Sequence, residues 1–146
     1  MADPVVRRPR RALSIAHQPI YAMLLPIPLV CFVGALLTDL AYSGSGGNLL
    51  WLNFSSWLLA AGLVFGGAAA VALLIDGLRV RGGWLALGLL AAAWIVELIN
   101  SFVHARDGWT AVHPVGLILS VIGALLALLS GWFASEARDI SLTGEL

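Results

Sequence analysis

The residues best suited to chemistry gather in one stretch of an otherwise apolar sequence, "VELINSFVHARDGW". Glu97, Asn100, Ser101 and His104 recur there at helical spacing, so their side chains share one stripe of a helix. A carboxylate beside an imidazole suits proton transfer, cofactor or metal binding, or a hydrogen-bonded clamp between helices. An ionisable side chain inside a membrane usually faces the bundle interior or water.

A second carboxylate, Asp39, and a second histidine, His113, are expected at the depth of His104. Asp39 ends the first apolar run, where the helix dipole disfavours negative charge, so it needs a cation or a donor such as Arg106 or a histidine. His104 and His113 bracket the loop "ARDGWTAV". Two histidines at one level suit a bis-imidazole haem b or a shared metal. The metal stays unknown, because no ligand spacing such as HExxH occurs.

Another polar group is expected at the opposite rim of the membrane, comprising His17, Tyr21, Asp76 and Arg79. Asp76 and Arg79 lie about one helical turn apart, which favours a salt bridge or a helix cap. A histidine with a carboxylate at such a rim also suits a quinone headgroup, although nothing in the sequence singles out that cofactor.

The elements that position these residues are membrane spans. Apolar residues make up 60% of the chain and charged residues 11%, against roughly 25% charged in soluble domains. A spanning helix needs about 20 mostly apolar residues, and uncharged runs predict helices near 19–41, 53–76, 83–104 and 113–134. Glu97 must belong to the third span, roughly 10 Å below the outer surface of a ~30 Å core. Pro26 and Pro28 should distort the first helix.

The arginines predict the orientation of the bundle. One side would hold only Arg106, and the other would hold Arg7, Arg8, Arg10, Arg11, Arg79, Arg81 and Arg138. We therefore predict an all-α, antiparallel four-helix bundle over 17–134 in the bacterial inner membrane. The basic tail 1–16 and the tail 135–146 would both be cytoplasmic. The first apolar stretch is too long for a signal peptide.

Several function classes find no support in the residues. The net charge is zero, which gives no basic surface for nucleic acid. There is no nucleophile elbow, no phosphate-binding glycine loop and no haem-attachment motif, so we expect no enzyme activity. Small residues such as Gly62 and Gly66 suit close helix contacts, either within the chain or between copies.

Three stretches resemble the bacterial family called domain of unknown function 2231: "HQPIYAMLLPIPLVCFVGALLTDL", "WLLAAGLVFGGAAAVALLIDGL" and "HPVGLILSVIGALLALLSGWF". The resemblance implies four-helix inner-membrane proteins, some joined to or beside redox modules. It also implies polar signature positions at His17, Asp39, Asp76 and His113, and a signature glycine at Gly62. Gly116 stands where the family has an Asn.

The leading hypothesis is a non-catalytic subunit or anchor of a membrane-bound redox assembly. Its partners would be the lipid bilayer, other membrane subunits or a periplasmic redox protein. The alternatives are an electron-transfer protein that binds haem b or a quinone through His104 and His113, and a proton or small-solute pathway through Glu97. Desolvation favours the protonated form of such a carboxyl group.

Overall fold

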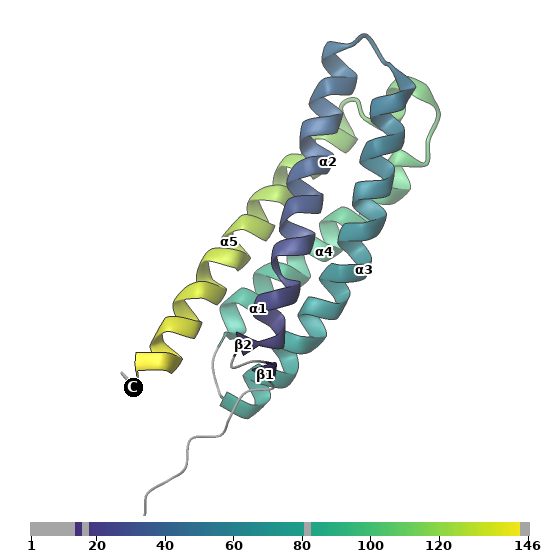
Figure 1. Cartoon of the computed structure of the whole chain (residues 1–146). Coiled ribbons are helices and arrows are strands. Elements are labelled where there is room, and N and C mark those ends of the chain that lie inside the picture. The colour runs from purple at the N-terminus through teal and green to yellow at the C-terminus, as the bar shows by residue number, and fades with distance from the viewer. Residues whose placement is uncertain (1–13, 16–17, 81–82, 144–146) are drawn as a thin grey trace, which may run out of the picture.

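The computed structural model describes residues 14–15, 18–80 and 83–143, with side chains over 20–78 and 83–136. Its helices are α1 (Ile20–Leu24), α2 (Pro26–Gly44), α3 (Leu49–Val80), α4 (Trp84–His104), the short 3-10 helix η1 (Gly108–Ala111) and α5 (Val115–Thr143). Four stretches are long and apolar enough to cross a membrane, ending at Gly44, Leu78, His104 and Glu136. The predicted all-α class with four spans is confirmed, and Figure 1 shows the helices lying side by side in an elongated bundle.

Some element boundaries differ from those expected. Helix α3 begins at Leu49, because the Asn48 side chain accepts a hydrogen bond from the Leu50 N–H at 3.0 Å and so caps the first turn. Helix α5 continues to Thr143, through residues where we expected a tail, since no proline interrupts it. Two-residue strands β1 (Ser14–Ile15) and β2 (Gln18–Pro19) pair antiparallel, which the sequence pattern did not predict.

The proline pair appears as a break in the first span. Helix α1 ends at Leu24 and α2 begins at Pro26, with Leu25 between them. Proline has no N–H, so Pro26 and Pro28 leave the carbonyls four residues earlier without their helical donors. The next backbone bond across the break, from the Leu29 N–H to the Leu25 carbonyl, is stretched to 3.5 Å.

Along three of the helices, successive buried residues are separated alternately by four and by three positions, a spacing called here the repeat of four and three positions. The series in α3 is Ser55, Leu59, Gly62, Gly66, Ala69, Leu73 and Asp76, and the series in α5 is Gly116, Ser120, Gly123, Ala127, Ser130 and Ala134. Helix α4 repeats it with Ala86, Leu90, Ala93, Glu97, Asn100 and His104. A repeat averaging 3.5 residues keeps one seam of each helix against its neighbours, as in coiled coils. The outward positions carry large apolar side chains such as Trp57, Val64 and Phe102, as lipid contact requires.

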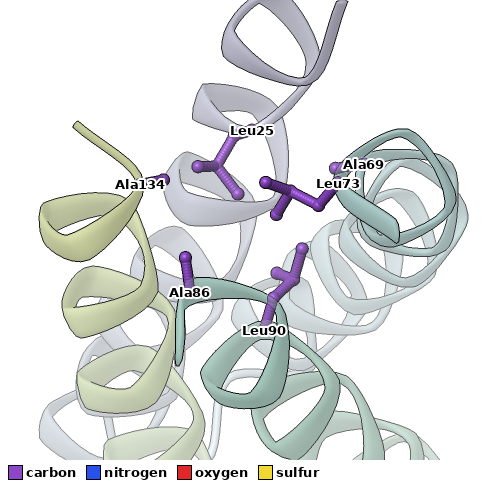
Figure 2. Packing of buried hydrophobic residues seen from close by; sticks show 6 residues of the cluster. All are labelled: Leu25, Ala69, Leu73, Ala86, Leu90 and Ala134. Atoms are coloured by element: carbon purple, nitrogen blue, oxygen red, sulfur yellow. The ribbon is translucent and has the colours of Figure 1, made fainter. Parts of the chain in front are cut away.

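The core is arranged in layers along the bundle. One apolar layer comprises Leu25, Ala69, Leu73, Ala86, Leu90 and Ala134 (Figure 2). The next comprises Phe32, Ala35, Leu59, Ala93 and Ala127. Beyond this second layer, toward the end that holds the α2–α3 and α4–α5 connections, the buried side chains become polar. The core is therefore mostly apolar at one end, where Ser130 and Asp76 are also buried, and polar at the other.

Glycines on α3 let the helices approach closely. A Cβ atom added to Gly62 would lie 2.5 Å from Phe32 Cε1, and one added to Gly66 would lie 3.3 Å from Trp94 Cδ1. The Trp94 indole N–H donates to the Leu63 carbonyl at 2.8 Å. Both glycines face neighbouring helices of the same chain, so this small-residue face is used inside the bundle.

The substitution Gly62→Ala should destabilise the bundle by about 1–3 kcal/mol, because the buried Phe32 ring has no room to yield to the new methyl group. Thermal unfolding in detergent, followed by circular dichroism, measures the effect. The matched control is Gly88→Ala, where a Cβ atom meets nothing within 4 Å and the change removes a helix-interior glycine. Equal unfolding temperatures for the two variants would contradict the packing described for Gly62.

Candidate functional site

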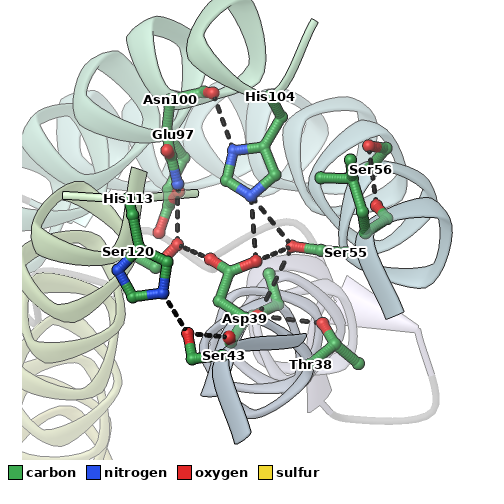
Figure 3. A network of polar contacts seen from close by, with 12 residues as sticks. Thr38, Asp39, Ser43, Ser55, Ser56, Glu97, Asn100, His104, His113 and Ser120 are labelled. Carbon is green, nitrogen blue, oxygen red and sulfur yellow. Dashed lines mark hydrogen bonds and ion pairs between the residues drawn. The ribbon is translucent and has the colours of Figure 1, made fainter. Parts of the chain in front are cut away.

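The polar layer is centred on the carboxylate of Asp39, which accepts a side-chain hydrogen bond from each of the other three long helices (Figure 3). Its Oδ1 atom accepts from Ser55 Oγ of α3 at 2.6 Å and from His104 Nε2 of α4 at 2.9 Å. Its Oδ2 atom accepts from Ser120 Oγ of α5 at 2.5 Å. Asp39 therefore ties α2 to α3, α4 and α5 at one level of the bundle.

The hydrogen-bond partners of His104 define its protonation state. Nδ1 lies 3.0 Å from the Asn100 carbonyl oxygen, which only accepts, so this nitrogen carries a hydrogen. Nε2 faces the Asp39 carboxylate, and the nearby Ser55 hydroxyl already donates its hydrogen to that carboxylate. Nε2 is therefore a donor as well. Opposite an ionised Asp39 both nitrogens donate, and His104 is then an imidazolium in a buried ion pair with Asp39.

Asn100 extends the network from Asp39 to Glu97. Its Nδ2 donates to Ser120 Oγ at 2.8 Å and to Glu97 Oε2 at 2.9 Å, and Ser120 passes the chain on to Asp39. Glu97 is buried against the backbone of α5 at Gly123. A Cβ atom added to Gly123 would lie 2.5 Å from Glu97 Cδ, so only glycine leaves room for this carboxyl group.

The polar layer is covered by the connection between α4 and α5. Ala111 and Val112 are buried there, and a Cβ atom added to Gly116 would lie 2.6 Å from the Ala111 carbonyl oxygen and 3.2 Å from His104 Cε1. The resemblance implies an Asn at position 116, but the close approach of the connection to His104 requires a glycine. Tyr42, also buried, closes the α2 side of the layer.

His113 contacts the layer from the connection. Its Nε2 lies 2.6 Å from Ser43 Oγ, whose hydroxyl donates to the Asp39 carbonyl at 2.8 Å. The imidazole stacks on Trp109 with ring centroids 4.1 Å apart. His104 and His113 therefore bind different groups. Ligation of haem by both would require His104 to give up one of its two hydrogen bonds.

The remaining predicted outer residues lie outside the network. The Ser101 hydroxyl donates to the Leu98 carbonyl of its own helix at 2.7 Å. Arg106 is exposed after the end of α4, and the partner that Asp39 needed is His104 instead. Over the part of the chain that the structure describes, no group of three or more His, Cys, Asp and Glu side chains is arranged to hold a metal ion.

Two of the predicted inner-rim residues, Tyr21 and Asp76, lie near the other end of the bundle. Asp76 is buried near the end of α3, and Tyr21 lines a cavity of about 260 Å³ between the first span and α5. The cavity wall is otherwise mostly apolar, with Leu25, Leu29 and Trp132 among its residues. His17 and the side chain of Arg79 lie outside the described residues.

Three serines that were not predicted from the sequence complete the site: Ser43, Ser55 and Ser120. A signal for two of them does exist. Ser120 lies between Gly116 and Gly123 in the repeat of α5, and Ser55 begins the corresponding repeat in α3. A seam position that carries a hydroxyl at the depth of a buried carboxylate predicts a donor to that carboxylate.

Comparison with known proteins gives one match. The family model described as "Predicted membrane protein (DUF2231)" matches residues 17–139, which include all of the polar layer. The chain belongs to this family. No curated protein and no solved structure matches the chain. The resemblance seen in the sequence is thereby confirmed, and this DUF2231 chain is an integral membrane protein with four candidate spans.

In this DUF2231 protein, removing one member of the Asp39–His104 pair should cost about 3–5 kcal/mol, because it leaves a buried charge without a partner. Asp39→Asn and His104→Gln should each lower the unfolding temperature sharply. The double variant should lose less than the sum of the single losses, by about 0.5–3 kcal/mol. Denaturation in detergent, followed by circular dichroism, measures this coupling.

The control for the pair is Asp107→Asn in the exposed loop, which should change stability by less than about 0.5 kcal/mol. Strictly additive losses for Asp39→Asn and His104→Gln would show that the two side chains do not act as an ion pair.

Proposed function

We propose that this protein is a non-catalytic scaffold subunit or anchor of a larger membrane-bound assembly, with no enzyme activity of its own. One observation carries the proposal: the Asp39 carboxylate and both His104 ring nitrogens are occupied by groups of the same chain. A carboxylate and an imidazole used in this way join helices and are themselves not available to a substrate.

The connections between helices support the same proposal. Residues 45–48 link α2 to α3, and residues 105–114 link α4 to α5, so these segments offer no separate domain for chemistry. The outward faces are large and apolar, and they suit lipid or the helices of partner subunits. A redox partner on the outer side is the class that the family resemblance favours.

The test is photo-crosslinking in native membranes from one outward position on each span: Val30, Trp57, Phe102 and Ile118. A partner-facing position should give a discrete adduct of higher mass, whereas lipid-facing positions should not. The buried Ala86 is the control, because it should form no intermolecular adduct. Absence of adducts from all four spans would contradict the subunit proposal. A Soret band in the purified protein, lost in His104→Ala or His113→Ala, would favour the haem hypothesis instead.

The orientation belongs to the same proposal: antiparallel spans in the bacterial inner membrane, with both termini cytoplasmic. Support comes from the seven arginines expected on one side and the single Arg106 on the other. In a Cys31→Ser background, a cysteine introduced by Ala105→Cys should react with a membrane-impermeant maleimide from the periplasm. Ala2→Cys should react only after the membrane is opened. The reverse labelling pattern would show that the protein has the opposite orientation in the membrane.

A further inference from the structure

Glu97 has fewer hydrogen-bond donors than its burial demands. Its side chain is fully buried, its Oε2 atom accepts one bond from Asn100 Nδ2, and its Oε1 atom has no partner. A buried carboxylate normally accepts several bonds or pairs with a cation. Glu97 does neither. It therefore differs from Asp39, the other carboxylate of the polar layer, which accepts three side-chain hydrogen bonds.

The charges that face Glu97 do not compensate a negative carboxylate there. The titratable groups whose charges act on Glu97 are Asp39 from α2 and His104 from α4, and these two already form a pair with no net charge. His113, from the connection, bonds to Ser43 instead. Helices α3 and α5 contribute the uncharged Ser55 and Ser120 to this layer. An ionised Glu97 would therefore add one unbalanced charge to the core of a membrane bundle, which is costly.

A second unpartnered oxygen lies in the same network. Asn100 Oδ1 is buried without a donor, although Asn100 Nδ2 bonds to both Glu97 and Ser120. Glu97 and Asn100 are one helical turn apart and are already joined through Nδ2 and Oε2. The two unpartnered atoms, Oε1 and Oδ1, are the other halves of the same carboxyl and amide groups. A hydrogen on Oε1 would make that atom a donor, the kind of group that Asn100 Oδ1 lacks.

We propose that Glu97 is a proton-binding site: it carries a proton on Oε1 and pairs with the Asn100 amide as a neutral carboxylic acid. The two groups then form a ring of two hydrogen bonds, from Asn100 Nδ2–H to Oε2 and from Oε1–H to Oδ1. The proton comes from the aqueous phase and forms the Oε1–H bond as the carboxylate is neutralised. This site goes beyond the scaffold function, because it gives the polar layer a bound ligand.

The surroundings suit a proton better than a larger cation. The Glu97 carboxyl group fills the space that a side chain at position 123 would occupy, with Gly123 beneath it. The second Asn100 N–H bonds to Ser120, which bonds to Asp39. The bound proton is therefore connected to the ion pair through two hydrogen-bonded side chains, and its presence fixes the orientation of the Asn100 amide.

Infrared spectroscopy of the full-length protein in lipid tests this site. Near neutral pH the wild type should show the C=O stretch of a protonated carboxylic acid, and Glu97→Gln should abolish it. The control variants Asp107→Asn and Glu136→Gln change exposed carboxylates and should leave the band intact. Absence of the band from the wild type, or its persistence in Glu97→Gln, would overturn the proposal. Loss of the band in Asp39→Asn with retention in Glu97→Gln would place the proton on the other carboxylate.

Thermal stability gives a second measurement, because glutamine mimics the protonated acid. Its amide can donate to Asn100 Oδ1 and accept from Asn100 Nδ2, so Glu97→Gln should unfold within a few degrees of the wild type. Glu97→Leu has a similar volume but breaks both bonds, so it should unfold several degrees lower. If Glu97→Gln unfolds as early as Glu97→Leu, the group that the fold requires is the carboxylate, and the proposal fails.

Discussion

The bundle depends on the burial of one carboxylate that is shared by four helices. Asp39 accepts a hydrogen bond from Ser55, His104 and Ser120, each on a different helix. Within a membrane, apolar surface does not distinguish one helix neighbour from another, because lipid is as apolar as leucine. A buried carboxylate is specific, since any other rotation of the helices would leave it without donors. Asp39 therefore determines which faces of α3, α4 and α5 turn inward.

Small residues make this arrangement sterically accessible. Short polar side chains such as serine reach a carboxylate only when the helix backbones lie close together, and Gly62, Gly116 and Gly123 allow that approach. The repeat of four and three positions holds the same seam inward along the whole length of each helix. The same repeat of buried positions therefore produces both the close packing of the helices and the polar layer.

Much of this organisation could be predicted from the sequence. The runs without charge indicated the spans, and counting residues along each helix placed Asp39, His104 and His113 at one depth, with Glu97 deeper in the third span. The partner of Asp39 could not be chosen, because helix counting gives depth but leaves the rotation of each helix about its axis undetermined. Arg106 was therefore as good a candidate as His104. The serines were missed because hydroxyl side chains occur throughout apolar helices, and only the seam repeat marks the ones that face the core.

The connection over the polar layer has a consequence for signals from outside the membrane. The backbone at Ala111 lies close to Gly116, which in turn lies beside the His104 ring, and His113 reaches the backbone of α2 through Ser43. The segment thus contacts residues that pack against the charged centre, and a protein that pulled or pressed on it would act on those neighbours of His104 and Asp39. At the opposite end, mostly leucine and alanine side chains separate the spans, and the Ser130 hydroxyl of α5 donates to the Ala86 carbonyl of α4 at 2.8 Å. The end that holds Asp39 is therefore joined by side-chain hydrogen bonds from all four spans, and a force applied to the connection reaches that network through contacting side chains.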